Sequence, residues 1–111
     1  MTQTITVIRG DGIGPEIMDA TLFVLDKLNT GLQYEDADAG LVALEKHGEL
    51  IPAATLESIT RNKVALKSPL TTPVGGGFSS INVALRRQFD LYANVRPAIS
   101  FPNTKSRYEN I

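Results

Sequence analysis

Residues 5–17 of this chain read ITVIRGDGIGPEI, and this stretch sets the fold class. Its first four residues are mostly β-branched and apolar, as is typical of a short buried strand. Glycines then interrupt the strand, and Pro15 fits the first position of a helix whose dipole Glu16 complements. That helix is expected to end near Leu28. The residues that recur in it at helical spacing are Ile17, Thr21, Val24 and Leu28, with Leu25 beside them.

Strand and helix patterns keep alternating after this unit, which predicts an α/β fold. The 111 residues are enough for one small domain, and no internal repeat or linker divides them. Further strands are expected at 32–37, 64–66 and 90–96, and further helices at 41–47, at 53–60 and, with Ser79 or Ser80 as N-cap, up to Gln88.

The composition excludes several classes of function. The net charge is −1, with 11 basic and 12 acidic residues and no basic stripe, so a nucleic-acid partner is not expected. The absence of cysteine excludes disulfides, thiolate metal sites and a cysteine nucleophile. There is no signal-peptide pattern and no apolar run long enough to span a membrane. We therefore expect no membrane partner and a cytoplasmic location, with the mitochondrial matrix as the alternative for a eukaryotic chain.

Two glycine clusters have more than one interpretation. The glycines of residues 10–14 follow a strand, but their G-x-G-x-G spacing and Pro15 depart from the Rossmann fingerprint, whose third glycine comes one residue later. The remaining interpretations are a tight turn that needs positive φ, or a loop that lines a ligand cleft. Residues 75–77 are not followed by the Lys-Ser/Thr pair of a phosphate loop. They are expected to form a hinge or a loop that closes over substrate.

Residues 67–87, KSPLTTPVGGGFSSINVALRR, join a loop to the start of an amphipathic helix. A helix start has unpaired N–H groups and the positive end of the helix dipole, so it attracts anions. Asn82 and Arg86 are four residues apart and share a helix face, with Ser80 at the helix start. Together they could hold a carboxylate-rich small molecule, with Arg86 as a bidentate clamp. The alternative is a capping serine followed by solvated polar residues.

Other ionisable residues have simpler interpretations. Arg96 follows a predicted strand and is either a second carboxylate clamp or a surface ion-pair partner. His47, the only histidine, lies at the end of a predicted helix, where its charge would favour the helix dipole. Asp36 and Asp38 could share a strand face, but they have no third ligand nearby. We interpret them as surface charge rather than as metal ligands.

Three blocks of this sequence together resemble the β-decarboxylating dehydrogenases, the family of isocitrate, homoisocitrate and 3-isopropylmalate dehydrogenases. The blocks are residues 8–17, 67–77 and 90–97, in that order. The resemblance implies a partial isopropylmalate-dehydrogenase-like α/β fold that differs from the Rossmann type. It covers essentially all of residues 1–111 but only the front part of the family's length. The chain is therefore expected to be the N-terminal portion of a truncated dehydrogenase domain.

The resemblance also implies roles for five residues. Ser80 and Asn82 would contact the γ-carboxylate of the substrate. Arg86 and Arg96 would clamp its other carboxylates, and Thr71 would contact the nicotinamide cofactor. Polar residues at positions 80 and 82 favour isocitrate, with homoisocitrate or 3-isopropylmalate dehydrogenase as an alternative. In some bacterial members the serine that matches Ser80 is a regulatory phosphorylation site, where a phosphate would repel the substrate carboxylate.

The implied activity is that of an oxidoreductase of the tricarboxylic acid cycle. It converts isocitrate to 2-oxoglutarate by oxidative decarboxylation, with a nicotinamide cofactor and Mg²⁺ or Mn²⁺. The tail at residues 100–108 favours NAD, with NADP as the alternative.

The family's catalytic Tyr and Lys, its third substrate arginine and its metal-binding aspartates lie beyond Ile111. We therefore expect this chain to carry no catalytic or metal-binding residue and to be inactive alone. It would act in a homo-oligomer or with a complementing dehydrogenase subunit. The main alternative is a non-catalytic binding or regulatory module for citrate-like acids or for a dehydrogenase subunit.

Two positions depart from the family pattern. Ser68 replaces the Gly that commonly follows the Lys, and Ser79 replaces a common Arg. The first change is expected to stiffen the loop, and the second removes a positive charge near the substrate.

Overall fold

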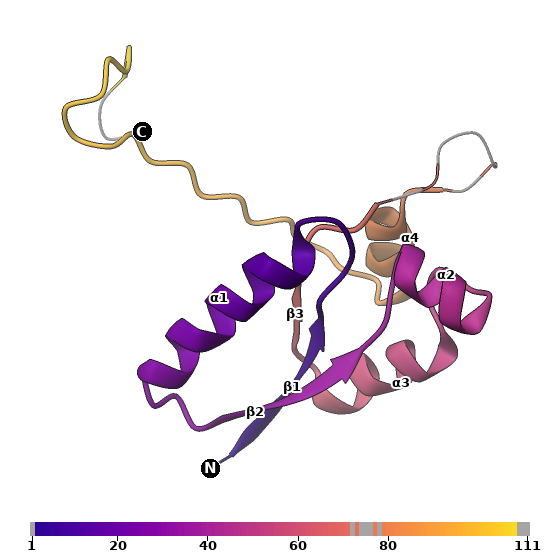
Figure 1. Ribbon diagram of the computed structural model, residues 1–111. Helices are drawn as coiled ribbons and strands as arrows, with labels where there is room; N and C mark the ends of the chain where they lie inside the picture. The colour runs from indigo at the N-terminus through magenta and orange to yellow at the C-terminus, as the bar shows by residue number, and fades with distance from the viewer. Residues whose placement is uncertain (1, 72, 74–76, 78, 109–111) are drawn as a thin grey trace.

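The computed structural model describes residues 2–71, 73, 77 and 79–108, and Figure 1 shows how their elements are arranged. A parallel sheet of three strands forms the centre, in the order β2-β1-β3. The α/β prediction is therefore confirmed. The strands are β1 (Gln3–Ile8), β2 (Leu32–Ala37) and β3 (Ala65–Lys67), and the helices are α1 (Gly14–Lys27), α2 (Leu41–His47), α3 (Ala53–Asn62) and α4 (Ile81–Gln88).

All three strands end at the same edge of the sheet. Ile8 at the end of β1 pairs with Ala37 on one side and with Lys67 on the other. The segments that follow the strands, at residues 9–13, 38–40 and 68–71, therefore lie next to one another. In open α/β sheets this carboxyl edge is where ligands bind.

One face of the sheet packs against α1 through an apolar core. Ile5 and Val7 of β1 are buried together with Met18 and Leu22 of α1. Residues alternate across a strand and recur every three or four positions along a helix, so these pairs face each other. Figure 1 shows α1 alone on this side of the sheet.

The buried side of α1 includes only part of the residues that the sequence places at helical spacing, since Leu25 packs against the core but others do not. Ile17, Val24 and Leu28 are exposed, whereas Met18 is only 2% exposed. The helix carries apolar residues on more than one side, and spacing establishes a helix without selecting which side is buried. Contact with β1 makes that selection.

The opposite face of β1 meets α3 through hydrogen bonds. Thr6 is fully buried, and its Oγ1 lies 2.8 Å from Ser58 Oγ. Asn62 Nδ2 donates to Thr6 Oγ1 at 3.0 Å and to Glu35 Oε2 of β2 at 3.1 Å. This network ties α3 to two strands and satisfies polar groups that would otherwise be buried without partners.

The prediction of a strand at residues 90–96 is wrong. Residues 91–100 have no regular secondary structure, and Leu91, Tyr92 and Val95 are exposed. In Figure 1 this part of the chain leads away from the sheet. A strand requires a hydrogen-bonded neighbour, and within the described ranges β3 pairs only with β1. The β propensity of these residues is therefore not sufficient to form a strand.

The remaining elements agree closely with expectation. α2 has the predicted bounds and ends at Gly48, whose φ is 75°. α3 runs to Asn62 rather than to Thr60, and β3 is shifted one residue along from 64–66. Ser80 is the N-cap of α4, but its hydroxyl makes no capping hydrogen bond to the described backbone. None of the helices in the described ranges has the length and apolar character needed to cross a membrane.

Candidate functional site

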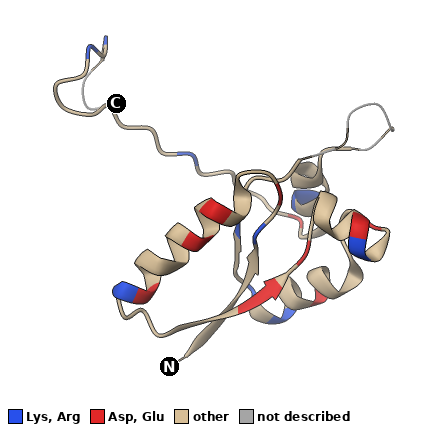
Figure 2. Cartoon of the chain, in the orientation of Figure 1, with Lys and Arg blue, Asp and Glu red and all other residues tan. Residues whose placement is uncertain are grey.

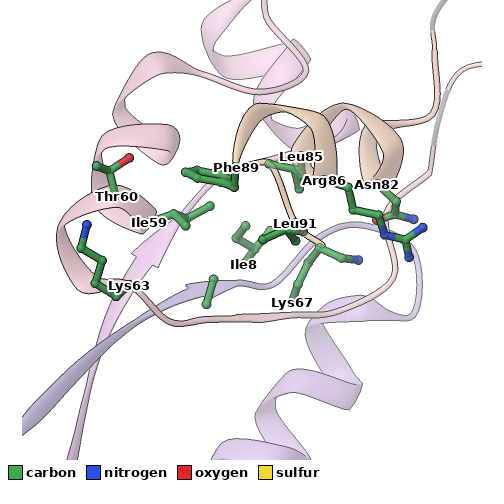
Figure 3. Close-up of a pocket in the computed structure, with 11 residues that line it drawn as sticks. Ile8, Ile59, Thr60, Lys63, Lys67, Asn82, Leu85, Arg86, Phe89 and Leu91 are labelled. Atoms are coloured by element: carbon green, nitrogen blue, oxygen red, sulfur yellow. The ribbon is translucent and has the colours of Figure 1, made fainter. Parts of the chain in front are cut away.

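A pocket of about 560 Å³ is lined by residues of α3, β3 and α4 and by the chain after α4. Figure 3 shows Lys67, Asn82 and Arg86 at one end of it, away from Ile59 and Phe89. The middle of the pocket is mainly apolar, as is typical of small-molecule sites, and Thr60 and Lys63 lie at the opposite end (Figure 3). The full lining comprises Ile8, Ile59, Thr60, Lys63, Ala65, Lys67, Asn82, Leu85, Arg86, Phe89 and Leu91.

The polar end of the pocket carries two cations, Lys67 and Arg86. No carboxylate among the described residues pairs with either of them, and Lys67 Nζ donates to the Ser68 carbonyl at 2.8 Å. Burial lowers the pKa of Lys67 below its usual value, and the positive charge of Arg86 lowers it further. A carboxylate bound here would relieve this repulsion, so the electrostatics favour an anionic ligand.

Asn82 lies in the first turn of α4, and its side chain faces the same end of the pocket (Figure 3). Its Oδ1 is buried and has no hydrogen-bond partner in the part of the chain that the structure describes. A buried amide oxygen without a partner costs free energy unless a ligand supplies one. The amide oxygen could accept from a ligand hydroxyl, while the amide nitrogen could donate to a carboxylate.

The structure brings together two of the five predicted site residues. Asn82 and Arg86 both line the pocket, whereas Ser80, Thr71 and Arg96 do not. Ser80 is exposed at the start of α4, and Thr71 is exposed in the segment after β3. Arg96 is exposed in the irregular segment after α4.

The glycine-rich segment between β1 and α1 forms the tight turn that its sequence allowed. Gly10 and Gly12 have φ of 71° and 58°, a conformation that other residues rarely adopt. Gly14 is needed for a different reason, because a Cβ there would collide with the Arg9 carbonyl. The hinge or lid predicted at residues 75–77 includes Gly75 and Gly76, which lie outside the described residues.

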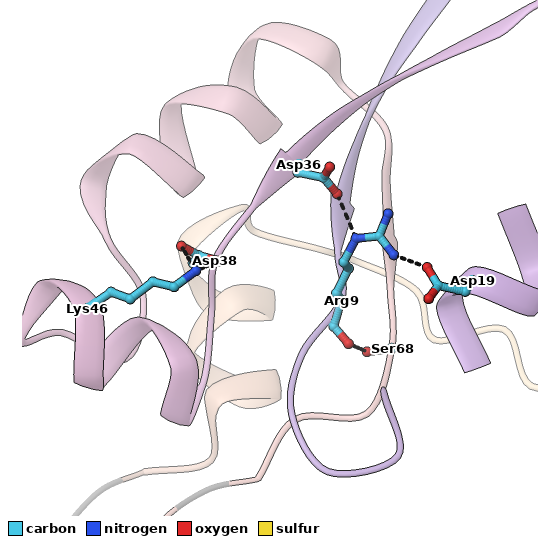
Figure 4. A network of polar contacts seen from close by, with 6 residues as sticks. All are labelled: Arg9, Asp19, Asp36, Asp38, Lys46 and Ser68. Atoms are coloured by element: carbon cyan, nitrogen blue, oxygen red, sulfur yellow. Dashed lines mark hydrogen bonds and ion pairs between the residues drawn. The ribbon is translucent and has the colours of Figure 1, made fainter. Parts of the chain in front are cut away.

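The other acidic residues singled out from the sequence form ion pairs near the ends of the strands. Arg9 Nε lies 3.1 Å from Asp36 Oδ1, and the same guanidinium pairs with Asp19 of α1 (Figure 4). Asp38 Oδ2 lies 3.4 Å from Lys46 Nζ and 3.1 Å from His47 Nε2. Charges of both signs are spread over several elements (Figure 2). Nowhere in the described ranges do three His, Asp or Glu side chains gather as metal ligands.

Comparison with known proteins identifies the group to which this chain belongs. The sequence profile of the isocitrate/isopropylmalate dehydrogenase family matches residues 4–111. The chain belongs to this family. The structural neighbours have the same fold, so the expected isopropylmalate-dehydrogenase-like architecture is confirmed.

Several members of the isocitrate/isopropylmalate dehydrogenase family are closely similar to this chain. The isocitrate dehydrogenase (NADP) of Thermus thermophilus is 50% identical over 107 residues, which is 96% of this chain and 22% of that protein. The mitochondrial isocitrate dehydrogenase (NAD) subunit alpha of Homo sapiens is 41% identical over 109 residues, 98% of this chain and 30% of that protein. The crystal structure of isocitrate dehydrogenase from Methylococcus capsulatus superposes with a TM-score of 0.89 at 50% identity, covering 96% of this chain and 32% of that one.

This dehydrogenase-family chain thus spans between 22% and 32% of the length of those relatives. Their names include both NADP and NAD types. Similarity to these relatives therefore does not favour one cofactor, whereas the tail at residues 100–108 favours NAD.

Sequence reasoning did not assign Lys67 to the site of this dehydrogenase-family chain. The residue is the last of β3, at the carboxyl edge of the sheet, and it shares the pocket with Arg86. The signal available in the sequence was a lysine directly after a predicted buried strand and before a Pro/Thr/Gly-rich loop. Its importance depends on α4, which places Arg86 nearby and is separated from β3 in the sequence.

Proposed function

We propose that this chain is the N-terminal portion of an isocitrate dehydrogenase and supplies part of the clamp for the substrate carboxylates. The complete enzyme would oxidise isocitrate and release CO₂ to give 2-oxoglutarate, with NAD as the preferred cofactor and NADP as the alternative. The chain itself would be inactive without the remainder of the domain, supplied in a homo-oligomer or by a complementing subunit.

The observation that carries the proposal is the unneutralised pair of cations beside Asn82. Lys67 and Arg86 share one end of a pocket with no carboxylate partner among the described residues. Isocitrate carries three carboxylates and a hydroxyl, which match two cations and an amide with a free oxygen. Arg86 would fix one carboxylate through two parallel hydrogen bonds, and Lys67 would act as a point charge.

Ser80, Arg96 and Thr71 have separate parts in this proposal. Ser80, at the start of α4, would donate its hydroxyl to the γ-carboxylate that Asn82 also contacts. Arg96 would reach a further carboxylate only after its exposed segment is ordered by the rest of the domain. Thr71 is exposed at the carboxyl edge of the sheet, and it would contact the nicotinamide part of the cofactor, which accepts the hydride.

The Mg²⁺ or Mn²⁺ of the proposed reaction does not fit the residues of this chain. No group of three potential ligands exists in the described ranges, and Asp36 and Asp38 are already ion-paired. We therefore assign the metal ligands, like the groups that transfer protons, to the remainder of the domain. What this chain does in the reaction is bind and orient carboxylates.

Binding of isocitrate to the purified chain tests the clamp directly. We expect Arg86→Gln to weaken isocitrate binding about tenfold or more, since a charge-assisted hydrogen bond is lost. Arg87→Gln is the matched control, because Arg87 is the adjacent exposed residue of α4 and does not line the pocket. Calorimetric titration of both variants with isocitrate and with 3-isopropylmalate is the measurement. Equal effects of the two substitutions, or tighter binding of 3-isopropylmalate, would contradict the proposal.

A second assay separates an enzyme portion from a binding module. Reduction of NAD⁺ and of NADP⁺ is followed with isocitrate and Mg²⁺, using the chain alone and then with the polypeptides that co-purify with it. We expect no turnover by the chain alone and turnover with a partner that carries the missing groups. Binding without turnover in either case would favour the non-catalytic module, and turnover by the chain alone would refute the assigned division of roles.

A further inference from the structure

The three segments that follow the strands are held together by one carboxylate. Asp11 lies in the turn between β1 and α1. Its Oδ1 and Oδ2 accept from the Thr71 backbone N–H at 3.0 and 3.2 Å, and Oδ2 also accepts from the Leu41 N–H at 3.2 Å. One side chain therefore joins the first turn of α2 to the segment after β3.

The packing around Asp11 leaves little room for another arrangement. A Cβ added to Gly40 would lie 2.6 Å from Asp11 Oδ2 and 3.2 Å from the side chain of Leu70. A Cβ on Gly10 would lie 3.1 Å from the same Leu70 side chain. Leu70, the residue before Thr71, is thus packed between two glycines that allow the segments to approach closely.

A second hydrogen bond closes the same junction from the other end. The Ser68 hydroxyl donates to the Arg9 carbonyl, and Figure 4 shows this contact beside the Arg9 ion pairs. Ser68 is 4% exposed and lies where a Cβ on Gly10 or Gly14 would collide with it. Residues 68–71 are therefore fixed to the β1–α1 turn at both ends, by Ser68 and by Asp11.

We propose that Asp11 is a positioning residue that sets the place of Thr71 in the cofactor site. The inference rests on the proposed function for the role of Thr71, whereas the contacts of Asp11 stand independently of it. No lysine, arginine or histidine among the described residues pairs with Asp11, so its negative charge serves backbone N–H groups only. Hydrogen bonds to an ionised acceptor are the stronger kind and impose direction. Because the Thr71 N–H is bound in this way, the backbone that carries the Thr71 hydroxyl is held in place relative to the β1–α1 turn.

The first test examines the contact in the 111-residue chain without reference to activity. Asp11→Asn weakens the acceptor for both N–H groups, so we expect faster hydrogen exchange and a changed amide proton shift at Thr71 and Leu41 in ¹H–¹⁵N spectra. Asp19→Asn, which removes an acidic group from the exposed Arg9 pair, is the control and should leave both amides unchanged. An unchanged Thr71 amide in Asp11→Asn would overturn the proposal.

The second test uses the active assembly of this chain and separates positioning from folding. We expect Asp11→Asn to raise the KM for the nicotinamide cofactor about tenfold while the KM for isocitrate changes less than about twofold. Leu41→Pro removes the other N–H that Asp11 binds, at a first helical position where proline is tolerated, and it should leave the cofactor KM unchanged.

The outcomes distinguish the two proposals. Equal rises in both KM values, or the same cofactor effect from Leu41→Pro, would reduce Asp11 to a general structural role. Altered Thr71 amides in an assembly that never reduces a nicotinamide would refute the proposed function while leaving the Asp11 contact established.

Discussion

The two faces of β1 are held in different ways. Toward α1 the buried contacts are apolar, through residues such as Val7 and Met18, and Tyr34 packs beside them with its hydroxyl donating to Asp26. Toward α3 the centre is the hydrogen-bonded group of Thr6, Ser58 and Asn62. Apolar burial provides most of the stabilisation per residue but little direction, whereas hydrogen bonds among buried groups fix one arrangement. The pocket lies on the second side, where α3 and α4 must be placed accurately.

The largest loss of stability is expected from a substitution in the apolar core between β1 and α1. Met18→Ala should lower the free energy of unfolding by about 2–4 kcal/mol, because a buried side chain is replaced by a cavity. Ile17→Ala changes the neighbouring residue of the same helix, which is 43% exposed, and should cost about 1 kcal/mol or less. Urea unfolding followed by circular dichroism measures both. Similar losses for the two variants would mean that α1 packs on the side that helical spacing suggested.

A smaller effect is expected on the polar side. Thr6→Val keeps the shape of the residue but removes the hydroxyl that meets Ser58 and Asn62, and it should cost about 1–2 kcal/mol of unfolding free energy. Ser58→Ala alone and the double variant complete a mutant cycle. If the network acts as a unit, the double variant will lose less than the two single losses combined. Additive losses would show that the hydroxyls contribute separately.

The smallest effect is expected on the pH dependence of stability, through Glu35 at the edge of the same hydrogen-bonded network. The hydrogen bond from Asn62 is the main cause that holds the pKa of Glu35 below its usual value of 4.5, and Ser58 and Arg61 contribute less. A lowered pKa in the folded state gives stability that is present above pH 4.5 and is lost as the pH falls through the folded value. Glu35→Gln should therefore have a flatter curve of melting temperature against pH in acid.

The matched control for this comparison is Glu57→Gln. Glu57 is an exposed acid of α3 that makes no ion pair within the described ranges. The Glu57→Gln variant should keep the parent chain's steep dependence of melting temperature on pH in acid. Identical curves for the parent and Glu35→Gln would remove Glu35 from the account of the polar face.

Local patterns predicted much of the fold, and particular residues show why. The strand predicted at residues 5–8, which the structure extends to Gln3–Ile8, follows from β propensity. The turn with positive φ at Gly10 and the end of α2 at Gly48 follow from glycine's freedom. Each depends on a few neighbouring residues. The predicted strand at 90–96 failed because strand formation also requires a partner and a buried face.

The candidate site was only partly predictable for a related reason. Asn82 and Arg86 lie on one helix, so their shared position in the pocket follows from helical spacing. Lys67 belongs to β3, and its approach to Arg86 depends on where α4 packs. The sequence indicates no role for Asp11, because its hydrogen-bond partners, Leu41 and Thr71, are 30 and 60 residues away.

The sequence by itself determined the α/β class, the positions of most elements and the resemblance to the β-decarboxylating dehydrogenases. Periodicity, turn residues and ordered motifs are properties of short segments, so they can be interpreted without coordinates. Only the tertiary structure decided which side of α1 is buried, that residues 91–100 form no strand, and that Asp11 binds the segment of Thr71. These outcomes depend on contacts between parts of the chain that are distant in the sequence. Such contacts contribute free energy only once the sheet has brought those parts together.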